Sequence, residues 1–302
     1  MYASRVGGDS HTMAIITEPQ PALFGHTPPR SQFLKWVGNK QRYAGEIADC
    51  LPADYRRYIE PFVGSGSVLA TVAPDAGLAG DTLEPLIEIW MLLKANPACL
   101  IEHYRHLWSQ YVSQPREVYE RVRDSYNSHP NGPDLLFLCR SCYGGIVRFT
   151  RAGTMSTPVG PHRAISPDSF AERVLTWRHR VSNTDFVCAD FEETMGTAGL
   201  NDVVYCDPPY VHTQRILYGA QEFLVERLWQ AIEGCRSQGA KVLLSLDGMK
   251  KSGRVYADIT IPDGLFEREI MIDCGGSMLR RFQMRGEDMR GERVHDRLLL
   301  TW

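Results

Sequence analysis

The chain has 302 residues, of which 43% are hydrophobic and 23% charged, and its formal net charge at pH 7 is −3. These values are typical of a globular protein and exclude collagen-like and disordered chains. No apolar run approaches the roughly 18 residues that cross a bilayer, and the first thirty residues lack the continuous apolar stretch of a signal peptide. The eight cysteines are scattered, which favours reduced thiols in a cytoplasmic protein over a disulfide scaffold.

Predicted strands and helices alternate along most of the chain, after a tail at residues 1–30 that is rich in Pro, Gly, Ser and Thr and is expected to be flexible. A strand, a glycine-rich turn and a helix are predicted from Tyr58 onward. Further strands are predicted at 78–81, 184–188, 202–206, 241–246, 267–272 and 295–302. Further helices are predicted at 86–94, 99–112, 116–127, 134–142, 169–180 and 222–238, with a loop or hairpin at 144–162.

Apolar strands separated by helices indicate an α/β fold with a mainly parallel sheet covered on both faces. The helical stretch at 95–182 interrupts this rhythm and is predicted to be a domain inserted into a core formed by 31–94 and 183–302. Between residues 139 and 180 this stretch has seven arginines and only two acids. Such a block is expected either on a nucleic-acid-binding surface or on an ordinary solvated face, and charge alone slightly favours the second.

The segment Glu60–Ser67, Glu-Pro-Phe-Val-Gly-Ser-Gly-Ser, lies at the carboxyl end of a predicted strand, where open α/β sheets bind ligands. It is not a dinucleotide fingerprint, because Leu69 occupies the position of the third glycine, and it lacks the Gly-Lys-Ser/Thr of a phosphate-binding loop. The next strand ends in Asp81, which could accept the hydroxyls of a ribose or could cap a helix.

A second group of residues, Asp207-Pro208-Pro209-Tyr210, directly follows a strand of the buried type. Two prolines cannot extend a central strand, and they remove two backbone donors, so this corner is stiff. It offers a carboxylate, a backbone carbonyl and a flat ring, which suits an exocyclic amino group on a planar base. A third segment, Phe33–Lys40, is by itself only an aromatic and two lysines before a helix.

Together these segments resemble the DNA adenine methylase (Dam-like, D12 class) family of N6-adenine methyltransferases, in the motif order of its α group. The shared patterns are F-L-K-W-x-G-x-K at Phe33–Lys40, E-P-F-x-G-x-G-S at Glu60–Ser67, an aspartate that closes the next strand at Asp81, and D-P-P-Y at Asp207–Tyr210. The resemblance implies a Rossmann-like, class I methyltransferase fold with S-adenosyl-L-methionine as cofactor. It further implies that the mostly helical insert recognises double-stranded DNA, in which the N6 amino group of a flipped adenine is methylated.

Site residues follow from the same resemblance, residue by residue. Catalysis is expected from Asp207, Pro208, Pro209 and Tyr210. Lys40 is expected to pair with the cofactor's carboxylate, Asp81 with its ribose, and Asp190-Phe191 to hold its adenine. The full set of expected cofactor-binding residues is Trp36, Lys40, Pro61, Phe62, Gly64, Gly66, Ser67, Asp81, Asp190, Phe191 and Asp207. The expected DNA-binding residues are Arg140, Tyr143, Arg148, Arg151 and Arg163.

The chain departs from the family pattern at several places, among them the loosely matching segments Val211–Tyr218 and Ser245–Gly248, which leaves the DNA recognition sequence open. Leu83 stands where the family often has asparagine, and Arg140-Ser-Cys-Tyr-Gly-Gly-Ile replaces the usual R-x-G-(F/Y)-N-G-L. Alternative functions are methylation of cytosine N4, RNA adenine or protein glutamine, and a non-catalytic DNA-binding module. A lone Cys139-x-x-Cys142 pair favours buried thiols over a metal site, so no metal is expected. A cytoplasmic protein of bacterial or phage origin is expected, with or without a cognate restriction endonuclease.

Overall fold

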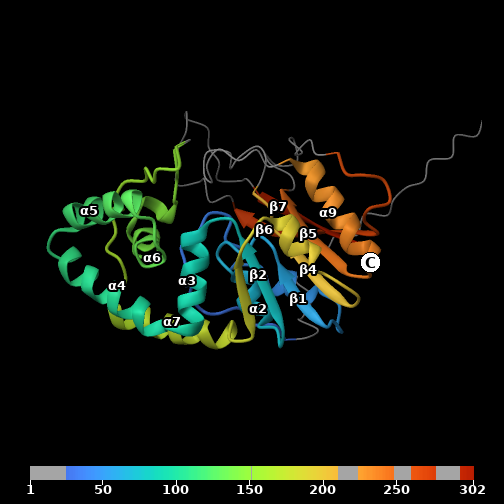
Figure 1. Cartoon of the computed structure of the whole chain (residues 1–302), viewed down its shortest axis with the longest axis horizontal. Helices are drawn as coiled ribbons and strands as arrows, with labels where there is room; N and C mark the ends of the chain where they lie inside the picture. Colours follow the sequence, from blue (N-terminus) through green and yellow to red (C-terminus); the bar gives the residue numbers. More distant parts are fainter. Residues whose placement is uncertain (1–24, 151, 210–223, 248–259, 277–292) are drawn as a thin grey trace, which may run out of the picture.

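The computed structural model describes residues 25–150, 152–209, 224–247, 260–276 and 293–302, and its centre is a seven-stranded sheet (Figure 1). The strand order is β3-β2-β1-β4-β5-β7-β6. Strands β1 to β5 are parallel, whereas β7 is antiparallel to both of its neighbours. The predicted Rossmann-like, mainly parallel sheet is therefore confirmed. The strands are β1 (Arg57–Glu60), β2 (Gly77–Asp81), β3 (Thr184–Cys188), β4 (Asp202–Cys206), β5 (Lys241–Asp247), β6 (Arg268–Gly276) and β7 (Arg293–Leu300).

Strand β4 shows why the central strands are continuously apolar. All five of its residues are buried. Val203 and Tyr205 belong to one hydrophobic cluster, and Val204 and Cys206 belong to another. Since successive side chains of a strand point to opposite faces, both faces of the sheet are covered and every position of a central strand needs an apolar side chain.

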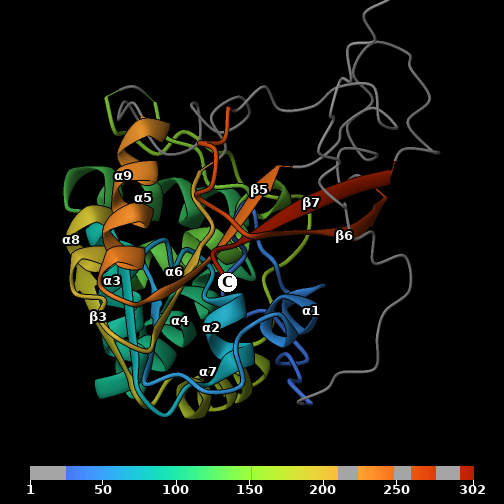
Figure 2. The ribbon, with the colours of Figure 1, turned by 90° about the vertical axis from the view of Figure 1, so that its right-hand side faces the viewer.

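Helices cover the two faces unequally. Helices α8 and α9 pack on one face, and α1, α2, α3 and α7 contribute to the cluster on the other (Figure 2). The short helix α1 is the helix expected after Phe33–Lys40, whereas α8, also six residues long, was not predicted. The helices are α1 (Ala44–Asp49), α2 (Ser67–Val72), α3 (Glu84–Ala95), α4 (Pro97–Tyr111), α5 (Pro115–Ser128), α6 (Gly132–Ser141), a 3₁₀ turn η1 (Tyr143–Gly145), α7 (Pro167–Arg180), α8 (Phe191–Gly196) and α9 (Val225–Ser237).

The helices α4, α5 and α6 form a lobe beside the sheet, in the chain segment between β2 and β3 (Figure 1). One continuous hydrophobic cluster contains Tyr58 of the sheet together with Tyr104 and Phe137 of this lobe. The lobe is therefore packed onto the sheet through a shared core. The division of the chain at residues 95 and 182 remains a prediction, and residues 1–24 of the predicted tail lie outside the described residues.

The beginning of the Phe33–Lys40 segment is part of this core. Phe33 and Leu34 are fully buried. The Phe33 ring lies 5.6 Å from that of Trp90 and 5.9 Å from that of Trp177, measured between centroids. Aromatic packing at these distances anchors the segment against α3 and α7. The residues that follow are thereby held at the edge of the sheet where the parallel strands end.

Candidate active site

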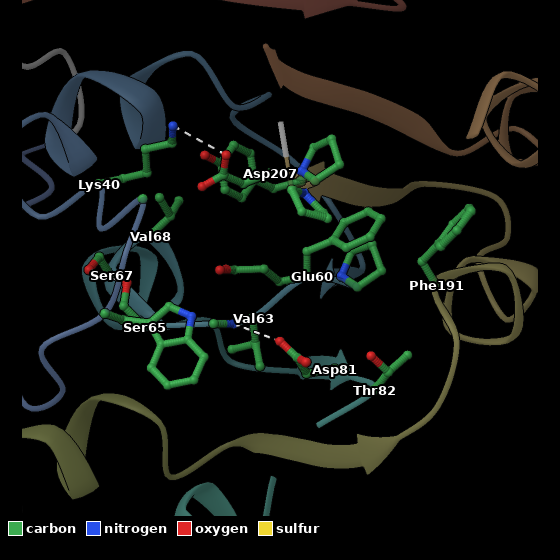
Figure 3. Close-up of a pocket in the computed structure, with 18 of the residues that line it drawn as sticks. Lys40, Glu60, Val63, Ser65, Ser67, Val68, Asp81, Thr82, Phe191 and Asp207 are labelled. Carbon is green, nitrogen blue, oxygen red and sulfur yellow. Dashed lines mark hydrogen bonds and ion pairs between the residues drawn. The ribbon is translucent and has the colours of Figure 1, made fainter. Parts of the chain in front are cut away.

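A cavity of about 430 Å³ opens at the carboxyl ends of β1, β2, β3 and β4 (Figure 3). Loops that follow these strands supply most of its walls, as expected for a ligand site in an open α/β sheet. Arg227 of α9 closes one side. Ten of the eleven expected cofactor-binding residues line the cavity, namely Trp36, Lys40, Pro61, Phe62, Gly64, Ser67, Asp81, Asp190, Phe191 and Asp207.

The turn between β1 and α2 forms the floor of the cavity. Gly64 has a φ of +42°, a left-handed conformation that favours glycine. Its N–H donates to the Asp81 carboxylate at 3.3 Å, and Val63 N–H donates to the carbonyl of Gly80 at 2.9 Å. The Ser67 hydroxyl donates to Asn39 Oδ1 at 2.8 Å. These bonds tie the turn both to the end of β2 and to the segment that carries Lys40.

Gly66 is the expected cofactor residue that does not line the cavity, and its role in cofactor binding stays a prediction. An added Cβ at Gly66 would lie 2.7 Å from Cη2 of the Trp90 indole, and its φ is +61°. The Trp90 indole N–H donates to the carbonyl of Gly64 at 3.3 Å. Glycine at this position therefore allows close packing of the turn against α3.

We expect Gly66→Ala to lower the free energy of unfolding by about 1–3 kcal/mol, because the new methyl group overlaps the rigid Trp90 indole and the backbone conformation is left-handed. Gly196→Ala is the matched control, since nothing lies within 4 Å of a Cβ at that helical position. Urea unfolding of both variants measures the difference. Equal stabilities would contradict the assigned role of Gly66.

Asp81 is held by two backbone donors. Its carboxylate accepts from Gly64 N–H at 3.3 Å and from Leu83 N–H at 3.1 Å, and burial raises its pKa. Helix α3 begins at Glu84 with Leu83 at its N-cap position, so Asp81 does not cap that helix. The carboxylate instead lies at the cavity wall, where it can accept hydrogen bonds from a ligand.

The corner after β4 brings Asp207, Pro208 and Pro209 to the cavity. Asp207 Oδ1 lies 3.2 Å from the ammonium nitrogen of Lys40, and the Asp207 side chain is 18% exposed. The same nitrogen lies 2.9 Å from Asp296 Oδ2 on β7 (Figure 3 shows Lys40 and Asp207). Lys40 thus lies between two protein carboxylates, of which Asp296 was not among the expected site residues. The expected stacking residue, Tyr210, lies outside the described residues.

Glu60 projects into the cavity between Asp207 and Asp81 (Figure 3). Its side chain is 3% exposed, and the Tyr58 hydroxyl donates to it at 2.6 Å. Burial raises the pKa of Glu60 to about 8, the negative charge of Asp207 adds to this rise, and the Tyr58 hydrogen bond opposes it. Glu60 is consequently mostly protonated at pH 7. Glu60 is the first residue of the Glu60–Ser67 motif, but it was not among the expected site residues.

The opposite wall is aromatic and carries a paired cation. The rings of Phe62 and Phe191 stack with centroids 5.2 Å apart, and the Arg227 guanidinium lies 5.0 Å from the Phe191 ring centroid. Asp190 caps α8 by accepting from Glu192 N–H at 3.0 Å, and it also accepts from Arg227 at 2.9 Å. Arg227 was missed by the sequence analysis, because only the packing of α9 on α8 brings it here.

A family model described as D12 class N6 adenine-specific DNA methyltransferase matches residues 36–264. The chain belongs to this family. It is 29% identical over 237 residues to the DNA N-6-adenine-methyltransferase of Escherichia phage P1, covering 74% of this chain and 31% of the phage protein. It is 34% identical over 183 residues to the DNA adenine methylase of Serratia marcescens, covering 59% of this chain and 66% of that protein.

A third relative is matched along nearly its whole length. The type II methyltransferase M.MjaIII of Methanocaldococcus jannaschii is 27% identical over 299 residues, which is 89% of this chain and 98% of the archaeal protein. Among solved structures, the rRNA methyltransferase aviRa from Streptomyces viridochromogenes has a TM-score of 0.37 and 13% identity over 87% of this chain and 84% of that one. The phage and Serratia proteins both contain regions that this D12 family member does not match.

The expected DNA-binding residues of this D12 family member fall into two groups. Tyr143, Arg148 and Arg163 are exposed in the segment between α6 and α7, and Arg151 lies outside the described residues. Arg140 is only 4% exposed and donates to the carbonyl of Phe33 at 2.7 Å and to that of Gln32 at 3.1 Å. A DNA contact by Arg140 stays a prediction, and in this structure its guanidinium donates to backbone carbonyls inside the protein.

The two cysteines of the Cys139-x-x-Cys142 pair are buried free thiols. Burial raises the pKa of Cys142 to about 12. Within the described ranges, no group of three or more His, Cys, Asp or Glu side chains is placed to hold a metal ion. None of the helices in those ranges has both the length and the apolar character that a membrane-spanning helix needs.

Proposed function

We propose that the chain transfers a methyl group from S-adenosyl-L-methionine to the N6 amino group of adenine in DNA. The observation that carries this proposal is the position of Asp207 and Pro208 at a cavity of about 430 Å³, directly after the buried strand β4. Family membership supplies the class of reaction, and the cavity supplies acceptors that suit an amino group. Together, family membership and these acceptors favour methyl transfer over a non-catalytic DNA-binding function.

The residues of the cavity fit the proposed cofactor. Its volume lies within the range of small-molecule sites. Asp81 offers carboxylate oxygens to ribose hydroxyls, and Phe62 and Phe191 offer flat apolar surfaces to an adenine ring. Carboxylates around the cavity suit a ligand with a sulfonium and an ammonium group. When bound, the cofactor supplies an already activated methyl group.

Asp207 and Pro208 have a simple chemical task in this reaction. The lone pair of adenine N6 is delocalised into the ring, so the amino group is a weak nucleophile. Hydrogen bonds from its two N–H groups to the Asp207 carboxylate and the Pro208 carbonyl favour a pyramidal nitrogen and localise the lone pair. The double proline holds both acceptors rigidly, and fixed positions of two bound reactants account for much of such an acceleration.

The target base has to leave the DNA stack before it can enter the cavity, which costs a few kcal/mol. We propose that the lobe between β2 and β3 recognises the DNA, with Tyr143, Arg148 and Arg163 as exposed contacts. Tyr210 is proposed to stack on the extruded base, a contact worth roughly 1–3 kcal/mol in comparable sites.

Transfer of a radiolabelled methyl group to unmethylated DNA tests the proposal. After digestion to nucleosides, the label is expected in N6-methyl-2′-deoxyadenosine. Label in N4-methylcytosine, or label transferred only to RNA or protein, would replace adenine with another acceptor. Absence of both transfer and cofactor binding would leave a DNA-binding module and overturn the proposal.

We expect binding of S-adenosyl-L-methionine at pH 7 to release part of one proton from Glu60. The free carboxyl is mostly protonated, because burial raises its pKa to about 8. A cation bound in the cavity favours the ionised form and lowers that pKa, so the proton leaves. Calorimetric titrations in two buffers of different ionisation enthalpy measure the number of protons released.

Glu60→Gln is the control, because its amide has nearly the same shape and cannot lose a proton in this range. The difference in proton release between the two proteins isolates Glu60 from the ionisable groups of the cofactor itself. Equal release by wild type and variant would show that Glu60 does not sense the bound cation.

A further inference from the structure

Three charged groups from distant parts of the sequence form one buried array. The Lys40 ammonium lies 2.9 Å from Asp296 Oδ2 and 3.2 Å from Asp207 Oδ1. The side chains of Lys40 and Asp296 are 4% and 6% exposed. Asp296 also accepts a hydrogen bond from the Tyr43 hydroxyl at 3.1 Å. The array therefore has one cation between two carboxylates, only one of which belongs to the Asp-Pro-Pro-Tyr corner.

The reversed direction of β7 brings Asp296 to this place. Asp296 pairs with Asp247 at the end of β5 and with Ile272 on β6. Because β7 is antiparallel to β5, the beginning of β7 lies at the carboxyl edge of the parallel strands. A residue near the start of this strand can therefore reach Lys40 at the cavity wall, whereas the start of a parallel strand lies at the opposite edge.

The charges explain what Asp296 contributes. A buried ammonium needs partners in more than one direction, and Asp296 holds Lys40 on the side away from the corner. The positive charge of Lys40 is shared between Asp296 and Asp207. Lys40 can therefore orient the Asp207 carboxylate without fully neutralising its negative charge. Three groups with a net charge of −1 leave the Asp207 carboxylate a strong acceptor for an amino group.

We propose that Asp296 is a positioning residue for methyl transfer, which fixes Lys40 so that the ammonium holds the Asp207 carboxylate in its working orientation. This role rests on the proposed function. Asp296 acts through Lys40 and is not itself among the residues that line the cavity.

Asp296→Asn tests this role, because the amide keeps the shape and one acceptor oxygen but removes the charge. The expected result is a fall in the single-turnover rate of methyl transfer of about 10- to 100-fold, as for other groups that orient a primary residue. The dissociation constant for S-adenosyl-L-methionine is expected to stay within about threefold, because Asp296 does not line the cavity.

Asp202→Asn is the matched control. Asp202 is likewise a buried carboxylate in an ion pair, with two cations, Arg56 and Arg57, in place of the single Lys40, and it lies at the other end of β4. Both variants are expected to lower the melting temperature, and only Asp296→Asn is expected to slow the transfer. Tyr43→Phe removes the second donor to Asp296 and is expected to slow transfer severalfold with unchanged cofactor affinity.

An unchanged transfer rate in Asp296→Asn would overturn the positioning role, and so would equal slowing in Asp296→Asn and Asp202→Asn. The proposed function would still be supported if the wild-type protein is active. If Asp296→Asn does not fold, Tyr43→Phe decides, and an unchanged rate in that variant overturns the role. A wild-type protein that makes no N6-methyladenine overturns the proposed function itself, and this role falls with it.

Discussion

Replacing Asp207 by alanine is expected to lower the rate of methyl transfer at least about 1,000-fold, since removal of one preorganised hydrogen-bonding group costs about 10²–10³ in comparable enzymes and this change also disturbs Lys40. The Pro208 carbonyl remains, which allows a residual rate. Affinity for S-adenosyl-L-methionine is expected to fall much less, because the aromatic wall and Asp81 are intact.

Single-turnover transfer from labelled cofactor to DNA measures the effect, with calorimetry for cofactor affinity. Asp185→Ala is the control, because that side chain is 82% exposed and pairs only with Lys94 in the described structure. Near-wild-type transfer by Asp207→Ala would show that the corner after β4 does not carry the reaction.

Replacing Lys40 by methionine is expected to lower the free energy of unfolding by about 3 kcal/mol or more, the usual cost of removing one partner from a buried ion pair. The substitution leaves the carboxylates of Asp207 and Asp296 close together without the ammonium between them. Adding Asp296→Asn to this variant removes one of the two charges and is expected to recover part of the loss.

Urea unfolding at neutral pH measures both effects. Lys94→Met is the control, because Lys94 is 36% exposed and its partner Asp185 is 82% exposed, and such surface pairs contribute at most about 1 kcal/mol. If the double variant were less stable than Lys40→Met alone, repulsion between the two carboxylates would not be the cause of the loss.

Much of the sheet was predictable because its central strands are short, apolar and bounded by turn residues. The strands 184–188 and 202–206 were predicted with the observed ends. Parallel pairing brings the carboxyl ends of β2 and β4 to a common edge, so the positions of Asp81 and Asp207 followed from the strand pattern. Helix α8 was missed because its six residues are too few for a helical period to be recognised and, unlike the equally short α2, it does not follow a glycine-rich turn.

The partners of the site residues were not predictable, because they depend on packing between distant segments. Lys40 and Asp296 are separated by 256 positions, and no local pattern connects them. Arg140 was counted with a basic block and expected at the surface. A signal was present, since every residue of α6 from Asp134 to Ser141 is buried, and a helix that is apolar nearly all round is expected in the interior.

The position of β7 has a consequence for the order in which the sheet assembles. Strand β7 follows β6 in the chain but lies between β5 and β6. Until it inserts, β5 has an open edge and β6 has no neighbour to pair with, so a nascent chain released from the ribosome only as far as β6 exposes hydrogen-bonding edges prone to aggregation. Pairing of β7 with β5 and β6 removes these open edges and places Asp296 next to Lys40. The sheet and the charged array are therefore completed in the same step of folding.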